Sequence, residues 1–478
     1  MTSRPAATDR IQPDRIDDVD LLVVGGGMAG LTAAAVAATE GARVVLVEKG
    51  EHLGGSAIYA GFAWTAPSVD VLREINPDGD PELGRTLVGG FAEGVDWIRS
   101  LGVDCRPAVP VLRYGRGHQF DTQHYLTRCE QRIRQHGGLI WTRTRAESLR
   151  MDGAAVTGAT VRRPDGGLSR IQARWTLLAS GGYQADPQLR AALIHPQAAG
   201  LQLRGNPGSE GDGLRLGRSA GAVFGTDGAG FYGHLIPAGV PLRDPSQYVD
   251  LALYFSEHAL LFNRTGERFV DETLGDHLST IALVAQPQAR GLLVADARTH
   301  RDWITQSYVD GGPAVDKFAL ASRLGARCAV AHSLDELDDM PAEWGYPGAK
   351  IRAAIERLNS TPDEPDRTSP GRRHDRPPLT EPPYYLLEAA PAITFTLGGL
   401  LIDPAARVRS AAGGRVPGLL AAGADAGGLY HQAYAGGLAA ALVFGRAAAR
   451  TATGAPAPSD SGVGVAGGTA VTRRSCRR

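Results

Sequence analysis

The stretch LLVVGGGMAGL, at residues 21–31, decides how the rest of the chain is interpreted. Four apolar residues bounded by glycines are typical of a buried parallel strand, and the alanine-rich run over 28–39 predicts the helix that follows it. Gly25 then permits a tight turn, Gly27 lets the backbone approach a pyrophosphate, and Gly30 lets helix and strand pack closely. The pyrophosphate would lie at the positive N-terminus of the helix.

A second apolar strand, over 42–47, ends at Glu48. This carboxylate lies at roughly the twenty-residue offset at which an acid accepts hydrogen bonds from the ribose of a dinucleotide. The glycine pattern alone is weak evidence in a chain with 62 glycines. With a strand before it, a helix after it and an acid at the end of the next strand, it predicts a dinucleotide-binding α/β domain without saying which dinucleotide.

Composition limits the classes of protein that remain. The 478 residues, 43% of them hydrophobic, are enough for two domains with substantial cores, and a net charge of −1 argues against binding nucleic acid. Residues 1–18 are polar and expected to be flexible, and no apolar run approaches a membrane span, so we expect a cytoplasmic protein. We expect reduced thiols and no metal site at the cysteines, which form no CxxC pair: Cys105, Cys129, Cys328 and Cys476.

The segment after the second strand, over 48–67, reads EKGEHLGGSAIYAGFAWTAP. An E-K-x(4)-G-G-S run behind a dinucleotide fingerprint resembles the fumarate reductase and succinate dehydrogenase flavoprotein family. The resemblance implies FAD, held in a Rossmann-like domain of the glutathione reductase type with an inserted α+β capping domain. It makes Ser56 a candidate neighbour of the flavin N5. The continuation to Trp64 and Pro67 is similar to the 3-ketosteroid Δ1-dehydrogenase branch. Because no histidine stands where respiratory members attach flavin covalently, we expect noncovalent FAD.

Later segments resemble further markers of this family, in the family's order. They are ASGG at 179–182, GDG at 211–213, NRTGERFVDE at 263–272, TLGG at 396–399 and the glycine-rich run over 418–438. These markers imply an FAD-binding domain over 19–230 and 384–451 and a capping domain with its return loop over 231–383. Residues 452–478 lack the apolar content to order themselves and are expected to be disordered.

Local patterns predict several elements within these domains. Amphipathic helices are expected over 81–102, 122–137, 333–339 and 348–359, and a final helix runs from Gly437 towards Arg450. The turn at 263–266 lies between two short apolar runs and predicts a hairpin. The fingerprint and the resemblance together imply FAD contacts from Gly25, Gly27, Met28, Ala29, Gly30, Glu48, Lys49, Gly54, Gly55, Ser56, Gly61, Ala146, Ala179, Ser180, Gly181, Asp212, Gly423, Asp425, Gly437 and Leu438.

The chain departs from fumarate reductases at three positions. Tyr434 stands where those enzymes hold a substrate carboxylate with an arginine, and Phe395 stands where they have a histidine. The segment after the capping signature, over 272–277, lacks the arginine that donates the proton in fumarate reduction. A small dicarboxylate is therefore a poor candidate substrate.

Tyr434 instead resembles the tyrosine with which 3-ketosteroid Δ1-dehydrogenases bond the substrate ketone. Polarising a carbonyl acidifies its α-carbon, so that a base removes that proton while hydride passes from the β-carbon to flavin. Asp276 or His277 is the candidate base. We therefore expect α,β-dehydrogenation of a cyclic or polyketide-like ketone, or the reverse enone reduction. Further candidates for substrate contact are Tyr59, Tyr430, His431 and Gly436.

Two alternatives stay open. A tyrosine at this position also resembles tricarballylate dehydrogenase-like members, which implies a carboxylated substrate, and a non-redox flavin-binding protein is the third alternative. With one dinucleotide fingerprint and no iron–sulfur cysteines, we expect a quinone, oxygen or another non-nicotinamide electron partner. In the carboxylate case the charge would be held by arginines of the capping domain, such as Arg264, Arg268, Arg372 or Arg373.

Overall fold

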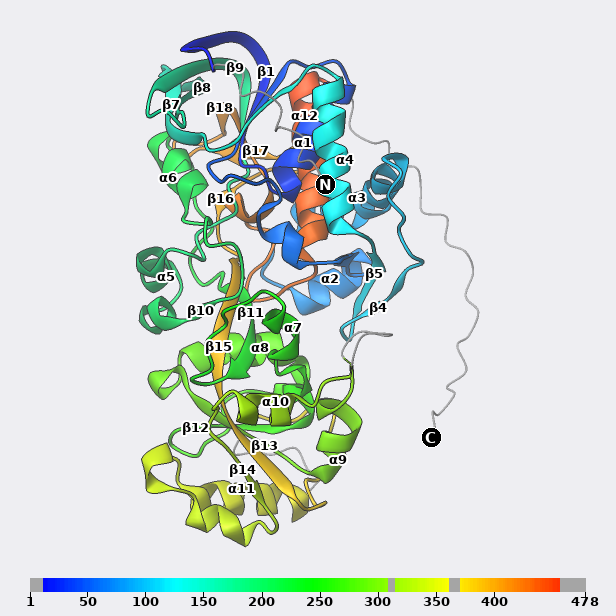
Figure 1. The fold of residues 1–478 in the computed structure, drawn as a ribbon, viewed down its shortest axis with the longest axis vertical. Helices are drawn as coiled ribbons and strands as arrows, with labels where there is room; N and C mark the ends of the chain where they lie inside the picture. Colours follow the sequence, from blue (N-terminus) through cyan, green and yellow to red (C-terminus); the bar gives the residue numbers. More distant parts are fainter. Residues whose placement is uncertain (1–11, 308–313, 361–369, 456–478) are drawn as a thin grey trace, which may run out of the picture.

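The computed structural model describes residues 12–307, 314–360 and 370–455. Its mixed α/β architecture is elongated, with the predicted FAD-binding domain at one end and the cap at the other (Figure 1). Strand β1 (Arg15–Val24) begins inside the segment expected to be flexible, so the ordered chain starts before residue 19. Residues 1–11, most of the predicted tail with Cys476, and part of the return loop (361–369) lie outside the described residues.

The first domain is built on a largely parallel sheet with β1 at its centre. β1 pairs with β2 (Val44–Val47) on one side and β9 (Leu168–Leu178) on the other, with Val23 opposite Leu46 and Leu177. All four residues Leu21–Val24 are buried, because helices cover one face of the sheet and an antiparallel meander joins it at β9. The remaining strands of this sheet are β6 (Leu139–Trp141), β7 (Arg145–Asp152), β8 (Ala155–Arg162), β17 (Arg407–Arg409) and β18 (Arg415–Ala421).

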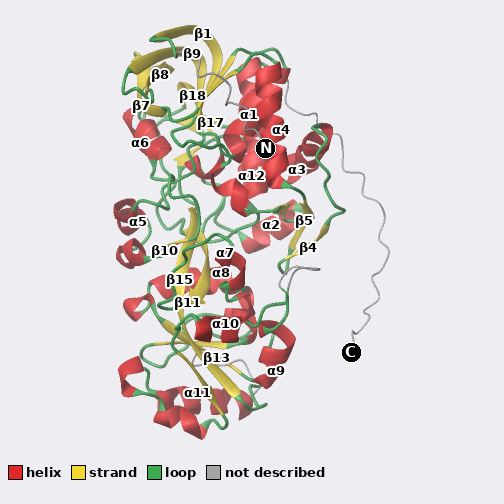
Figure 2. Ribbon diagram, viewed as in Figure 1, coloured by secondary structure: helices red, strands yellow, loops and turns green. Residues whose placement is uncertain are grey.

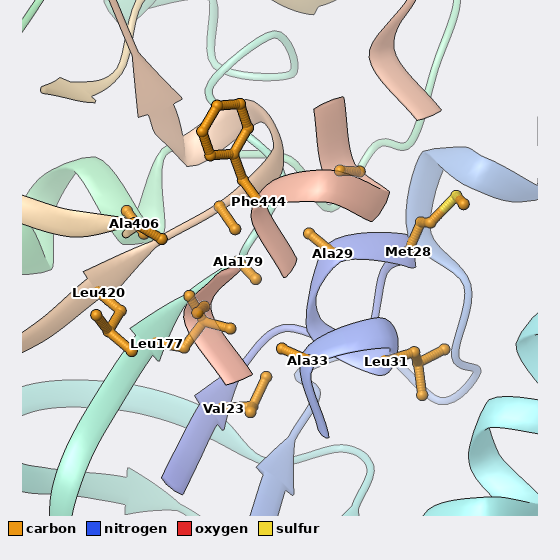
Figure 3. Packing of buried hydrophobic residues seen from close by; sticks show 14 of the residues in the cluster. Val23, Met28, Ala29, Leu31, Ala33, Leu177, Ala179, Ala406, Leu420 and Phe444 are labelled. Carbon is orange, nitrogen blue, oxygen red and sulfur yellow. The ribbon is translucent and has the colours of Figure 1, made fainter. Parts of the chain in front are cut away.

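Helix α1 (Met28–Thr39) has the predicted bounds and is buried along almost its whole length. It lies against the sheet, α4 (Thr122–Gln135) and α12 (Gly437–Thr453), which Figure 2 shows side by side. Its alanines allow this close approach, and Figure 3 shows Val23, Ala29, Ala33 and Phe444 together in the resulting core. The fingerprint segment is therefore held between layers and has little freedom to move.

The other predicted helices of this domain also form. α3 (Pro81–Ser100) begins after Asp80, whose carboxylate accepts two backbone N–H bonds, and α4 begins after Asp121, whose carboxylate accepts one from His124. The remaining elements are α2 (Val69–Ile75), α5 (Pro187–Leu193), α6 (Asp212–Ser219), a small antiparallel sheet of β3 (Phe62–Thr65), β4 (Val109–Val111) and β5 (Gly115–Gln119), and the pair β16 (Leu400–Leu401) and β19 (Ala426–Gly427). In the described ranges no helix has the length and apolar character needed to cross a membrane.

The cap is organised around β15 (Tyr384–Thr396), which runs lengthwise through the lower part of the molecule in Figure 1. The sequence placed residues 384–396 in the second part of the FAD-binding domain. β15 instead pairs with β13 (Gly291–Ala295), β14 (Cys328–Ala331) and β11 (Phe231–Pro237), so it is the central strand of the cap's sheet. Two further strands complete that sheet, β10 (Gln202–Leu203) beside β15 and β12 (Leu260–Asn263) beside β13.

The hairpin predicted at 263–266 is only half formed. After the turn, a single bridge joins Phe262 and Arg268, and the true partner of β12 is β13. The chain turns inward here because Glu272 is buried and accepts the Leu261 N–H, together with the Arg268 guanidinium.

The helices predicted in the cap form to different extents. The one expected over 333–339 is a short 3₁₀ turn over Asp335–Asp339, whereas the one expected over 348–359 is α11 (Gly348–Ser360). The remaining cap helices are α7 (Gln247–Asp250), α8 (Asp276–Val284), α9 (Ala297–Thr299) and α10 (Lys317–Arg323).

Candidate active site

One continuous cavity of about 1420 Å³ extends from the glycine-rich turn into the cap. On the first domain it is lined by Gly25, Glu48 and Ser56, and on the cap by His234 and Lys317. A cavity of this size is large enough for a bulky cofactor and a substrate together.

The glycine-rich turn fits a pyrophosphate. Gly25 has a φ of +110°, and a Cβ there would lie 2.2 Å from the Ala179 carbonyl oxygen, so a larger residue is excluded. A Cβ on Gly27 would meet its nearest atom at 4.0 Å. Helix α1 starts after Gly27 with no side-chain cap and no acid in its first turn. Its first N–H groups and the positive end of its dipole are thus available to an anion.

Glu48 is held in place by two backbone amides. Its Oε2 accepts the Gly26 N–H at 2.7 Å and its Oε1 accepts the Gly50 N–H at 2.7 Å. Because an ionised carboxylate has about four acceptor positions, each oxygen keeps capacity for a ribose hydroxyl. This geometry fits the predicted role at the adenosine end of the cofactor.

Two acids in the family markers organise the wall of the cavity. Asp425 is buried, which raises its pKa, and its carboxylate accepts the N–H groups of Ser180 and Gly182. Asp212 bonds Lys49 at 2.7 Å and Arg145 at 2.6 Å, and these cations hold its pKa below the usual range although burial opposes the shift. Through these bonds Asp425 joins the last family marker to residues 180–182, and Asp212 joins α6 to Lys49 and Arg145.

Most of the residues predicted to contact FAD line the cavity, and three do not. Gly30, Gly54 and Asp425 lie outside its lining, where they support the turns and strands that form it. Those that line it are Gly25, Gly27, Met28, Ala29, Glu48, Lys49, Gly55, Ser56, Gly61, Ala146, Ala179, Ser180, Gly181, Asp212, Gly423, Gly437 and Leu438.

Tyr434 lies in the cavity wall at the start of α12. Its hydroxyl oxygen accepts the Gly437 N–H at 3.0 Å, and its ring stacks on Tyr232 with centroids 3.7 Å apart. Trp64 meets the same ring edge-on at 5.2 Å. Burial raises the pKa of Tyr434 to about 12, so the phenol is protonated at neutral pH. Its own proton is available to an acceptor in the cavity.

The two predicted bases, Asp276 and His277, lie beside Tyr232 at the start of α8. Asp276 is engaged by the Nδ1 of His234 at 2.6 Å, and both side chains are buried. The ring nitrogens of His277 have no partner among the described residues, and burial lowers its pKa to about 3. Burial also lowers the pKa of His234, so both histidines are neutral at pH 7. His234 was missed from the sequence, where it belongs to no motif.

Two of the four predicted substrate residues line the cavity. These are Tyr59, whose ring lies 5.5 Å from that of Tyr248, and Tyr430, whose hydroxyl donates to the Gly436 carbonyl at 3.1 Å. His431 and Gly436 are not in the lining. His431 turns away because its Nε2 lies 3.3 Å from the Asp227 carbonyl oxygen. Gly436 packs directly against the Trp64 carbonyl oxygen.

The cations of the cavity differ from those expected. Three of the predicted arginines are paired with acids inside the cap: Arg264 with Glu388, and Arg268 and Arg372 with Glu272. Of the four, only Arg373 lines the cavity. Two cations that the sequence did not single out, Arg204 and Lys317, line it and are buried. No clustering of three or more metal-ligating side chains occurs in the part of the chain that the structure describes.

Comparison with known proteins agrees with this geometry. Residues 20–439 match the family model described as an FAD binding domain. The chain belongs to this family. A cytochrome-type fumarate reductase from Shewanella frigidimarina is 28% identical over 91% of this chain and 77% of its own length. A vinyl phenol reductase from Lactiplantibacillus plantarum is 27% identical over 87% of this chain and 92% of its own length.

Solved structures show the same fold. A 3-ketosteroid Δ1-dehydrogenase from Sterolibacterium denitrificans superposes with a TM-score of 0.72 at 19% identity, covering 93% of this chain and all of that one. A 3-ketosteroid Δ4-(5α)-dehydrogenase from Rhodococcus jostii gives a TM-score of 0.71 at 19% identity, with 91% and 96% covered. The protein is thus an FAD-dependent oxidoreductase that acts on CH–CH groups, as the sequence predicted.

Noncovalent attachment of FAD remains a prediction. Acid precipitation of the purified yellow protein should release all of its flavin into the supernatant, because noncovalent contacts are lost when the protein unfolds. The measurement is the ratio of soluble to pelleted flavin absorbance. Flavin that stays in the pellet after washing would contradict noncovalent binding.

Proposed function

We propose that the enzyme introduces or reduces a C=C bond α,β to the carbonyl of a cyclic or polyketide-like ketone, with Tyr434 polarising the carbonyl. The observation that carries this proposal is the bond from the Gly437 N–H to the Tyr434 hydroxyl oxygen. Accepting a hydrogen bond makes the phenol a stronger donor through its own proton. The positive end of the α12 dipole lies at the same point and favours negative charge developing on a bound carbonyl oxygen.

The α-proton requires a base, and His234 is better suited than either predicted residue. The Asp276 carboxylate, 2.6 Å from the His234 Nδ1, favours the tautomer in which Nδ1–H donates to Asp276 and the lone pair is on Nε2. An adjacent carboxylate also stabilises the imidazolium that forms when the base accepts a proton. His277 has no such partner among the described residues, so it would hold the added charge poorly. In this proposal Asp276 positions His234.

The walls between these groups suit a flat substrate. The rings of Tyr232, Phe395 and Tyr434 contact one another, and Tyr254 packs edge-on against His234 at 5.0 Å. Aromatic faces bind planar rings and keep water away from the reacting carbons. Bound FAD supplies the hydride acceptor or donor.

A carboxylated substrate is the second candidate, and a specific observation supports it. Arg204 and Lys317 are buried in the cavity wall, where their positive charges would attract an anion. They could take the place of the fumarate-binding arginine, which Tyr434 replaces. The names of the two relatives do not decide between the candidates, since one concerns fumarate and the other a vinyl phenol.

A substrate panel tests the proposal. Reduction of an artificial dye is measured with 3-ketosteroids and cyclohexanones, and enones are tested in the reverse direction with reduced dye. Succinate and tricarballylate serve as carboxylates that lack a ketone. We expect turnover with a ketone or enone, and no bleaching of the flavin by NADH or NADPH alone. Preference for succinate or tricarballylate would replace the proposal with its alternative.

A further inference from the structure

Arg204 and Lys317 lie together at the last turn of α7. The Arg204 Nε donates to the Tyr248 carbonyl at 3.0 Å, while the Lys317 Nζ donates to the carbonyls of Val249 at 2.9 Å and Asp250 at 3.2 Å. Three consecutive carbonyls therefore hold two cationic groups from distant parts of the chain. Both groups also lie over tyrosine rings, Arg204 over Tyr248 and Lys317 over Tyr254, each at 5.6 Å.

Neither cation forms an ion pair with a carboxylate of the described residues. A second pair of buried cations among the described residues, Arg268 and Arg372, shares the Glu272 carboxylate. Arg204 and Lys317 are 7% and 5% exposed, and two buried like charges without an acid between them are costly. A bound anion would supply the opposite charge and offset this cost.

The two cations also face the space used by the substrate. Arg204 donates to the Thr394 hydroxyl at 3.0 Å, and the next residue, Phe395, packs against the Tyr434 ring at 5.5 Å. Thr394, Arg204 and Lys317 all line the cavity. An anionic group bound by them would belong to the same molecule as a carbonyl bound at Tyr434.

We infer that Arg204 and Lys317 form a carboxylate subsite, so that the substrate is a cyclic ketone or enone that also carries a carboxylate. The carbonyl half of this statement rests on the proposed function, whereas the carboxylate half rests on the two cations alone. A guanidinium and an ammonium at one point match the two oxygens of a carboxylate through charge-assisted hydrogen bonds. This assignment unites the ketone and carboxylate readings in one substrate.

The test compares 4-oxocyclohexanecarboxylate with its methyl ester, which has the same ring and ketone but no charge. Binding to the oxidised holoenzyme is followed by the change in flavin absorbance, without turnover. The wild-type enzyme should bind the acid more tightly than the ester. Arg204→Gln and Lys317→Met should each weaken acid binding about tenfold to a hundredfold and leave ester binding unchanged. The control is Arg106→Gln, which removes an exposed cation of the cavity lining and should change neither.

The pH dependence gives a second signature. Burial lowers the pKa of Lys317 to about 8, with Asp250 raising it and Arg204 lowering it further, and the Tyr254 ring faces the same ammonium. Lys317 is therefore charged below about pH 8 and loses its proton above it. Acid binding should weaken by up to about tenfold per pH unit above 8, while ester binding stays level. Lys317→Met should abolish this dependence.

Thermal unfolding separates a ligand site from a structural cap of α7. Without ligand, Lys317→Met should raise the unfolding midpoint, since it removes a buried charge that forms no ion pair with a carboxylate of the described residues. A lower midpoint, or variants that weaken acid and ester equally, would indicate a structural role and overturn the subsite. So would a wild-type enzyme that binds the acid no more tightly than the ester.

Tyr434→Phe separates the two halves of the inference. It should weaken binding of the acid and of the ester alike. If Tyr434 does not bind the carbonyl, the difference between acid and ester binding still tests the carboxylate subsite.

Discussion

Replacing Tyr434 by phenylalanine is expected to lower turnover about a hundredfold to a thousandfold while FAD remains bound. The variant keeps the ring that stacks on Tyr232 and loses the hydroxyl that would donate to the substrate carbonyl. The measurement is kcat with the best ketone of the panel, alongside the visible spectrum of the flavin. Because burial raises the pKa of Tyr434 to about 12, the wild-type rate should show no decline centred on the ordinary tyrosine pKa.

Tyr430→Phe is the matched control. Tyr430 is also buried in the cavity wall, but its hydroxyl already donates its hydrogen bond to the Gly436 carbonyl. Its loss should leave turnover within a few-fold of wild type, in keeping with the modest worth of one neutral hydrogen bond. Full activity of Tyr434→Phe, or equal losses in both variants, would remove the proposed role of Tyr434.

The second large effect concerns the stability of the cap. Glu272 is fully buried and accepts bonds from Arg268 at 2.9 and 2.6 Å and from the Leu261 N–H at 2.9 Å, with Arg372 at 3.5 Å. Glu272→Gln keeps the shape of the side chain and removes the buried negative charge that the Arg268 and Arg372 guanidinium groups share. We expect the free energy of unfolding to fall by about 3–5 kcal/mol, because breaking a buried pair strands the remaining charge.

Urea unfolding followed by circular dichroism measures this loss. The control is Glu267→Gln on the same turn, where the carboxylate is exposed and pairs with Lys350 at 3.0 Å. That variant should unfold near the wild-type midpoint, since exposed ion pairs contribute little. A Glu272→Gln protein as stable as Glu267→Gln would show that the buried cluster does not hold the cap together.

The dinucleotide site could be predicted from sequence because its requirements are local. Gly25 needs a positive φ, α1 needs a run of small apolar residues, and Glu48 needs only to end the next strand. Each of these three requirements produces a sequence pattern within about thirty residues, the length of a single βαβ unit. The helices expected from residues 81 and 122 were predictable for the same reason, and α3 and α4 begin there.

The cap was less predictable because its pairings are long-range. Residues 384–396 form the single strand β15, and only its partners β11, β13 and β14 place it in the cap's sheet. The second half of the hairpin predicted at 263–266 was lost because burial of Glu272 with Arg268 and Arg372 outweighs the local preference for a strand. The intrinsic strand propensity of a segment does not include these long-range contacts.

The chemistry of the cavity was decided by tertiary structure. The sequence by itself determined that Tyr434 replaces the carboxylate-binding arginine of fumarate reductases, because this depends only on which residue occupies one position of a family marker. It did not reveal that His234 meets Asp276, or that Arg204 meets Lys317 at the end of α7. Such side chains come from separate elements and follow no period or motif, so their meeting depends on how the strands and helices of the cap pack against one another.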